Sequence, residues 1–261
     1  MNSRWHHLEI SFCVHWESPW HVGSGMGTVG VDRLLRFRVA AVREGQSDRR
    51  VLRRVPYVPG SQLKGVLRHQ CERLYAAWAG KVVPVHAGTG APPKELLHHF
   101  GPLVKSPLLV DRLFGNRFQG ECLFVEDALP ESWEERSWLI MGRTAVDRRT
   151  GTVREGTLFF TQVGVSSFPP LRSRVLGRHP PGVLTQDGDA FPFEYALLVA
   201  ALMTIDALGA DKSAGFGRCQ LRIENIRWNE HASLPLEEAL RPLEDPEWPE
   251  LAALVRENSP S

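Results

Sequence analysis

The sequence has no long hydrophobic run and few cysteines. No apolar stretch in the 261 residues approaches the length of about 18 that a transmembrane helix needs, and Met1–His7 lacks the apolar core of a signal peptide. The four cysteines, at positions 13, 71, 122 and 219, form no CxxC pair, which excludes a disulfide framework and a zinc knuckle. We therefore expect a cytoplasmic protein with free thiols and no membrane partner.

Lysine is also scarce, since only five of the 31 basic residues are lysine and 26 are arginine. Guanidinium groups bind phosphate oxygens in a bidentate manner, although a GC-rich genome would produce the same bias. The net charge of +1 is unevenly distributed. Residues 229–261 hold eight acids and two arginines, so residues 1–228 carry a net charge of +7. A basic body with an acidic tail permits an anionic partner.

Hydrophobic periodicity predicts an α+β protein. The predicted elements are a half-buried strand at 7–16, a basic extended segment at 34–42, an amphipathic helix from Ser61 to Trp78, a short helix at 108–114, a strand at 121–127, a long hairpin at 139–165 with its tip at 148–151, an apolar helix at 193–208 and a closing strand at 219–223. Ser61 is the predicted N-cap of the first helix. Residues 166–192 are predicted to form a mobile, arginine-bearing loop.

This order of elements is that of a ferredoxin-like/RRM-like βαββαβ core. We expect it to occupy residues 1–228, with a glycine-rich loop, a thumb-like hairpin and insertions at about 80–107 and 139–192. An acidic, proline-rich tail follows at 229–261. Two helices on one face leave the other face of the sheet open, and RRM domains bind RNA on that face. Because the fold hosts many functions, the function must be argued from particular residues.

Two glycine-containing segments resemble nucleotide-binding motifs but lack their context. Residues 25–30 spell GxGxxG, yet they lie several residues beyond the strand and precede an extended segment instead of a helix. Residues 209–218 contain a Lys-Ser pair, but Asp211 stands where a P-loop has glycine, and a helix precedes the segment. Glycine N–H groups beside Lys212 and Arg218 suit an anion, whereas a helix C-cap and a tight turn would explain Gly209 well but Gly215 and Gly217 poorly.

The start of the first helix combines Gly60-Ser61-Gln62-Leu63 with Lys64 and, one turn later, Arg68. A cation in the first turn is unfavourable against the helix dipole. Either a phosphate binds at this helix N-terminus, where free N–H groups favour anions, or Lys64 extends into solvent.

The ten histidines show no metal-binding spacing. They include the adjacent pairs 6–7 and 98–99, and no HExxH motif occurs. His21, just before the glycine-rich segment, is the one histidine that we keep as a functional candidate.

Motifs spanning residues 8–226 together resemble the RAMP superfamily, the RNA-binding subunits of CRISPR effector complexes. The resemblance is closest to the backbone subunit of type III complexes. The residues that carry it are His21–Gly25, Val31-Asp32, Tyr57–Arg68, Leu113–Gly115, Ala145–Arg148 and Gly209–Gly217. The sequence departs from the family in having Arg33-Leu34-Leu35 where members often have a proline, and in an extra turn between Asp32 and Tyr57.

The resemblance implies a repeated subunit of an antiviral ribonucleoprotein that polymerises along guide (CRISPR) RNA together with other RAMP subunits. A thumb-like hairpin would interrupt the duplex of guide and target RNA at regular intervals. In the nuclease members, an aspartate after the first strand cleaves target RNA with a divalent metal. Asp32 is the matching position, so Mg²⁺ or another divalent cation is expected if the chain is catalytic.

The predicted RNA-binding residues are the glycines and polar or basic side chains of these motifs. They are Gly23, Ser24, Gly25, Arg36, Arg38, Gly60, Ser61, Lys64, Arg68, Arg143, Arg148, Arg149, Lys212, Ser213, Gly215, Gly217 and Arg218. Asp32 is the predicted catalytic residue and metal ligand. A salt bridge between Asp32 and one of the arginines at 33, 36 and 38 is the alternative role.

Two other functions fit the same residues. One is a stand-alone endoribonuclease of the same superfamily that processes guide RNA, with His21 as general base on a 2′-hydroxyl and no metal. The other is a ferredoxin-like enzyme acting on a small molecule. Cleavage that resists a chelator would favour the former, and a compact monomer without RNA affinity would favour the latter.

Overall fold

The computed structural model describes residues 5–45, 48–78, 109–115, 120–133, 138–185 and 190–244. Its centre is an antiparallel sheet in which β10, β1, β9 and β4 lie side by side in that order, with β5 also paired to β9. The elements of this core are β1 (His6–Trp16), α1 (Gly60–Trp78), β4 (Leu123–Val125), β5 (Leu129–Pro130), β9 (Leu171–His179), α4 (Phe193–Met203) and β10 (Cys219–Trp228). The βαββαβ order and the predicted ferredoxin-like α+β class are thus confirmed.

The third core strand is β9, in a segment that the sequence analysis predicted to be a mobile loop. That prediction is wrong for Leu171–His179, which pairs with β1 from Val14↔Leu171 to His6↔His179. Prolines on both sides of the segment favoured a loop, and arginines at 172, 174 and 178 lowered its apolar content. The alternation is nevertheless that of a strand with one buried face: Arg172 and Arg174 are exposed, while Leu171 and Val175 are buried.

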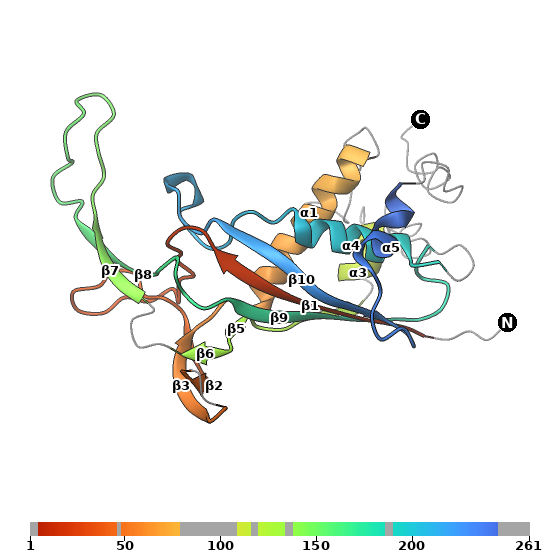
Figure 1. The fold of residues 1–261 in the computed structure, drawn as a ribbon. Coiled ribbons are helices and arrows are strands. Elements are labelled where there is room, and N and C mark those ends of the chain that lie inside the picture. Colours follow the sequence, from red (N-terminus) through yellow and green to blue (C-terminus); the bar gives the residue numbers. More distant parts are fainter. Residues whose placement is uncertain are drawn as a thin grey trace.

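Two hairpins lie outside the central sheet. Among the described strands, β7 (Trp138–Arg143) pairs only with β8 (Phe159–Gly164), which confirms the predicted hairpin as a two-stranded ribbon; single bridges join β8 to Trp20 and Arg33. Its side chains Leu139, Ile140 and Leu158 are exposed. The second hairpin consists of β2 (Phe37–Glu44) and β3 (Arg50–Pro56), with β6 (Ser132–Trp133) beside β2. Of these strands, the sequence predicted only the extended segment around β2. Figure 1 shows the two hairpins projecting in opposite directions from the same end of the sheet.

The helices cover one face of the sheet (Figure 1). The inward side chains of β1, among them Ile10, Phe12 and Val14, pack in a single core with α1 and α4. The apolar helix predicted at 193–208 ends earlier, at Met203. Ile205 and Leu208 are buried in the non-helical segment that follows, so the apolar content of the sequence predicted a helix that is too long.

The remaining described elements are short. They are α3 (Leu109–Phe114), the 3₁₀ turns η1 (Lys212–Ala214) and η2 (Arg241–Leu243), and α5 (Leu236–Leu240). α5 folds back on α4, with Ala239 fully buried. The predicted insertion at 80–107 and the end of the acidic tail lie outside the described residues. No helix in the described ranges is long and apolar enough to cross a membrane.

A buried polar network joins α3 to β9 and α4. The Glu194 carboxylate is fully buried and accepts hydrogen bonds from Arg112 Nη1 at 2.9 Å and from the Thr185 N–H at 2.8 Å. His179 lies 3.2 Å from the Arg112 carbonyl through Nε2 and 2.6 Å from the Tyr195 hydroxyl through Nδ1. Because a carbonyl only accepts, Nε2 carries the proton, and the imidazole is neutral with both nitrogens bonded.

Burial lowers the pKa of His179 to about 4, which makes folding pH-dependent. In the unfolded chain this imidazole protonates near pH 6.5, so between about pH 6.5 and pH 4 the unfolded state binds more protons than the folded state. The free energy of unfolding should therefore fall by roughly 2 kcal/mol between pH 7 and pH 5 from this group alone. Urea unfolding of the wild type and of His179→Gln at both pH values checks this. Equal pH dependence in both proteins would contradict it.

Candidate functional site

Three segments that are distant in the sequence meet at the end of the sheet from which the hairpins project. They are the glycine-rich segment between β1 and β2, the base of the β7–β8 hairpin, and the loop between α4 and β10. Trp20 and Gly164 exchange backbone hydrogen bonds, and the Ala210 N–H donates to the His21 carbonyl at 2.8 Å. A Cβ at Gly164 would lie 2.2 Å from the Trp20 ring, and one at Gly209 would lie 2.5 Å from the His21 oxygen. Glycine is therefore required where these backbones meet.

Asp211 connects all three segments. Its Oδ2 accepts hydrogen bonds from Arg33 Nη1 at 2.9 Å and from Arg143 Nη1 at 2.6 Å. Burial opposes ionisation, but the hydrogen bond and charge of Arg143, together with Arg33, hold the pKa of this carboxyl below its ordinary value. The Arg143 guanidinium also lies 4.7 Å from the centre of the Phe216 ring. In the sequence Asp211 signals only that the segment is no P-loop, so this bridging role was missed.

Asp32 is held by the base of the β7–β8 hairpin. Its backbone N–H donates to the Phe160 carbonyl at 2.9 Å, and its Oδ2 accepts from the Phe160 N–H at 2.7 Å. The side chain is exposed, and its other oxygen, Oδ1, has no hydrogen-bond partner within the described ranges. The alternative role for Asp32 was a salt bridge. That alternative is wrong for the described residues, because Arg33 pairs with Asp211, Arg38 pairs with Asp127, and Arg36 has no acidic partner among them.

His21 is buried, with an exposed fraction of only 2%. Its Nδ1 lies 2.7 Å from the Gln162 carbonyl and must donate, so Nε2 carries the lone pair in the neutral ring. Burial, with help from the Arg33 and Arg143 charges, lowers the pKa of His21 despite the opposing hydrogen bond to Gln162. The ring is therefore neutral at pH 7 and has one basic nitrogen.

Asp32 and His21 line the same cavity, which has a volume of about 310 Å³. The lining residues are His21, Gly23, Gly25, Met26, Asp32, Arg33, Leu34 and Ala210. Gly25 adopts a left-handed backbone with φ of 80°, and Ser24 donates its N–H to the Leu34 carbonyl. The predicted residues 21, 23, 25 and 32 are thus brought together at one site.

A single exposed carboxylate suits Mg²⁺ but not a closed protein site. No group of three or more histidine, cysteine or acidic side chains within the described residues is arranged to hold an ion. Mg²⁺ usually keeps several waters and binds through one or two carboxylates plus substrate phosphates. The open Oδ1 of Asp32 fits that kind of binding, with the phosphate supplied by a substrate.

The N-terminus of α1 already holds an anion, and it is a carboxylate of the chain itself. Asp127 Oδ1 accepts the Gly60 N–H at 2.7 Å. The helix begins at Gly60, so Ser61 is not its N-cap. A Cβ at Gly60 would lie 2.0 Å from the Val125 carbonyl oxygen. Lys64 does not extend into solvent either, because its Nζ donates to the Leu123 carbonyl at 2.8 Å and pairs with Glu121.

The remaining predicted RNA-binding side chains differ in whether an acid already binds them. Arg68 pairs with the buried Asp111 at 3.1 Å and with Glu72. Arg218 is exposed and lies 3.8 Å from Glu17. By contrast, four cations have no acidic partner within the described residues; they are Arg36, Arg148, Arg149 and Lys212. Arg148 and Arg149 lie at the exposed tip of the hairpin, and Lys212 and Ser213 are exposed in η1.

The expectation that a tight turn explains Gly215 and Gly217 poorly is wrong, because both glycines have a structural role. Gly215 is the C-cap of η1 in a left-handed conformation with φ of 82°. Gly217 also has positive φ, and a Cβ there would lie 2.0 Å from the Leu208 carbonyl oxygen. These glycines form a tight turn that presents Lys212 and Ser213 at the surface.

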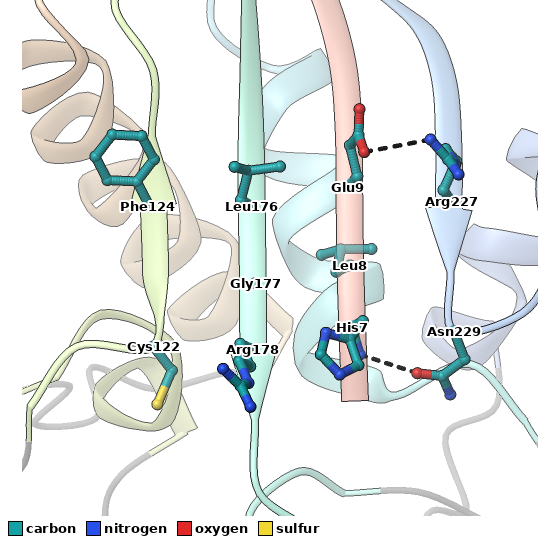
Figure 2. Close-up of a pocket in the computed structure, with 10 residues that line it drawn as sticks. All are labelled: His7, Leu8, Glu9, Cys122, Phe124, Leu176, Gly177, Arg178, Arg227 and Asn229. Atoms are coloured by element: carbon teal, nitrogen blue, oxygen red, sulfur yellow. Dashed lines mark hydrogen bonds and ion pairs between the residues drawn. The ribbon is translucent and has the colours of Figure 1, made fainter. Parts of the chain in front are cut away.

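The open face of the sheet lacks the aromatic platform of RRM domains. The outward side chains of β1 are polar or small, and those of β9 are mostly arginine. Figure 2 shows a shallow pocket on this face in which Glu9 pairs with Arg227 at 3.5 Å. Phe124, with an exposed fraction of 60%, lies on the edge strand β4. Because RRM domains stack bases on central strands, the loop site is the stronger candidate for RNA.

Comparison with known proteins points to one family. A family model described as RAMP superfamily matches residues 15–220. A chain in a solved structure titled "Type IV-B CRISPR Complex" superposes with a TM-score of 0.52 at 16% identity, covering 83% of this chain and 90% of that chain. At this identity the likeness establishes the fold. Among curated proteins, none matches the sequence.

The Asp211→Asn variant tests whether this carboxylate holds the β7–β8 hairpin in place. The amide cannot pair with two guanidinium groups, so we expect the free energy of unfolding to fall by about 1.5–3 kcal/mol. Hydrogen exchange should accelerate in both hairpin strands more than in β1. Asp206→Asn, the same substitution at an exposed carboxylate in the same loop, serves as the control. Unchanged exchange in the hairpin of Asp211→Asn would contradict the role.

Proposed function

The chain belongs to the RAMP superfamily, and on that basis we propose that it is an RNA-binding backbone subunit of a type III-like, CRISPR-associated antiviral ribonucleoprotein complex. Its partners would be guide RNA, target RNA and other RAMP subunits. The observation that carries the proposal is the convergence of the glycine-rich segment, the η1 loop and the hairpin base at the Asp32 cavity. The shared fold with a chain from a CRISPR complex supports it.

RNA would be held mainly by the cations that have no acidic partner within the described part of the chain. Lys212 and Arg36 are near the segments that form the cavity, and Arg148 and Arg149 extend from the hairpin tip. Arg218 adds to this set, since its exposed pair with Glu17 is too long and too solvated to compete strongly with a phosphate. The projecting hairpin suits the proposed role of separating the bases of a guide–target duplex.

Lys212→Gln/Arg218→Gln should weaken binding of single-stranded RNA regardless of its sequence. Each phosphate contact contributes about 0.7 to the slope of log K against log salt, so the slope should decrease by about 1.4. Fluorescence anisotropy over a range of salt concentrations measures it.

Arg68→Gln is the matched control. That change removes one positive charge that is bound to the buried Asp111. It should lower the melting temperature and leave the salt slope unchanged. The assignment would be reversed if the salt slope decreased in Arg68→Gln and stayed at the wild-type value in Lys212→Gln/Arg218→Gln.

In the proposed cleavage of target RNA, Asp32 is the catalytic residue. Its Oδ2 is fixed by the Phe160 N–H, which leaves Oδ1 to take up a hydrated Mg²⁺. When bound, the ion supplies charge stabilisation beside the scissile phosphate. The hairpin base holds the carboxylate in place, and the Arg33 side chain, tied to Asp211, forms one wall of the same cavity.

Asp32→Asn tests this assignment in the assembled complex with target RNA and Mg²⁺. Asparagine keeps an acceptor for the Phe160 N–H but loses the charge that attracts the ion. Cleavage should fall by at least about a hundredfold, while guide and target affinities stay within a few-fold. Asp206→Asn should cleave normally. Wild-type cleavage by Asp32→Asn would reduce the chain to a binding scaffold.

A metal-independent, stand-alone processing endoribonuclease is the second candidate, because the neutral His21 has its basic nitrogen at the same cavity. The exposed fraction of 2% leaves little of this ring accessible to a 2′-hydroxyl, which favours Asp32. Cleavage of guide precursor that survives EDTA and is lost in His21→Gln would instead support this second function.

A further inference from the structure

The arginines of the β2–β3 hairpin lie on two opposite faces. Residues opposite each other in an antiparallel pair share a face, and successive residues alternate between faces. The register places Arg38 and Arg53 on one face and Arg43, Arg50 and Arg54 on the other. On the first face each arginine is neutralised: Arg38 pairs with Asp127, and Arg53 pairs with Glu44 at 3.2 Å.

The second face has no acidic residue and carries an unfavourable charge pair. Arg43 and Arg50 are directly opposite each other on neighbouring strands. Like charges in that position are destabilising. Neither guanidinium has an acidic partner within the described residues, and both are exposed. Arg54, on the same face, lies 4.9 Å from the Phe37 ring centre and also has no ion pair in that part of the chain.

This face forms one wall of a groove of about 530 Å³. Ala41, Arg43 and Arg50 line the groove from the hairpin side. The opposite wall is the open face of the sheet, where two arginines pair with three glutamates: Arg172 pairs with Glu131 and Glu224, and Arg174 pairs with Glu126. That wall has one negative charge in excess, so the net positive charge of the groove comes from Arg43 and Arg50 of the hairpin.

We propose that the Arg43–Arg50–Arg54 face binds the phosphate backbone of single-stranded RNA, as a second RNA contact outside the Asp32 cavity. The inference rests on the proposed function, since it takes the chain to be an RNA-binding subunit. An anion between Arg43 and Arg50 would convert their repulsion into attraction for a common ligand. Neither residue belongs to the motifs that carry the family resemblance.

The spacing of the face favours a polymer over a small anion. Arg50 and Arg54 are four residues apart on one strand, or about 13 Å at roughly 3.3 Å per residue. Leu52 lies between them with an exposed fraction of 72%, and an aliphatic side chain there can pack against a ribose or base. β2 begins at Phe37, three residues after the cavity-lining Leu34, so the chain runs directly from the cavity into this hairpin.

The test compares Arg43→Gln/Arg50→Gln with Arg53→Gln/Arg227→Gln in the full chain. Both double variants lose two charges, but Arg53 pairs with Glu44 and Arg227 pairs with Glu9, whereas Arg43 and Arg50 have no acidic partner among the described residues. With a 30-nucleotide single-stranded RNA of mixed sequence, the former should decrease the salt slope by about 1.4 and weaken binding about tenfold or more at 0.1 M salt. The latter should leave the slope within about 0.3 of the wild-type value.

Folding and the proposed function are checked separately. Because Arg43 and Arg50 repel, their replacement should leave the melting temperature equal to or above that of the wild type. If wild-type protein binds no RNA, the proposed function itself fails. If Lys212→Gln/Arg218→Gln weakens RNA binding but Arg43→Gln/Arg50→Gln does not, only this inference is overturned. Loss of self-association in sedimentation with unchanged RNA affinity would likewise overturn it, by assigning the face to protein contacts.

Discussion

The Asp211 carboxylate lies between two guanidinium groups, and the geometry of the candidate site depends on this contact. Arg33 comes from the glycine-rich segment and Arg143 from the base of the β7–β8 hairpin, so one partly buried anion connects segments that approach from three directions. The Asp32 side chain is fixed by Phe160, and Phe160 belongs to the strand paired with that of Arg143. Electrostatic attraction at Asp211 thereby determines where the Asp32 oxygens lie. The close-packed glycines at 164, 209 and 217 make this convergence sterically possible.

The fold was readable from the sequence wherever apolar spacing dominated. The alternation in β1 and the apolar content of α4 each identified their element, and the order of elements identified the fold class. The third core strand was missed because arginines occupy its outward positions and prolines flank it. β3 was missed for a related reason: three arginines in seven residues mask its alternation. In both cases exposed guanidinium groups, which the sheet tolerates on an open face, hid the pattern.

The sequence indicated candidate site residues but not their charge balance. His21, Gly23, Gly25 and Asp32, which the motifs singled out, line one cavity, and their roles stay predictions. Sequence alone could not show which cations are neutralised, because ion pairs such as Arg68–Asp111 join residues more than 40 positions apart. The cation in the first turn of α1 did indicate a bound anion, and the helix holds one there. This anion is the carboxylate of Asp127, which follows β4 and also binds Arg38.

The β7–β8 hairpin makes few contacts with the rest of the molecule beyond its base. Two-stranded ribbons are marginally stable in water on their own, and this one exposes Leu139, Ile140, Leu158 and Phe160. The outer edge of β8 is bonded by the glycine-rich segment, but β7 has no second partner among the described strands. Apolar side chains beside an unpaired strand edge favour association with other strands. The isolated chain therefore carries an aggregation risk, which burial of these apolar side chains against another molecule would remove.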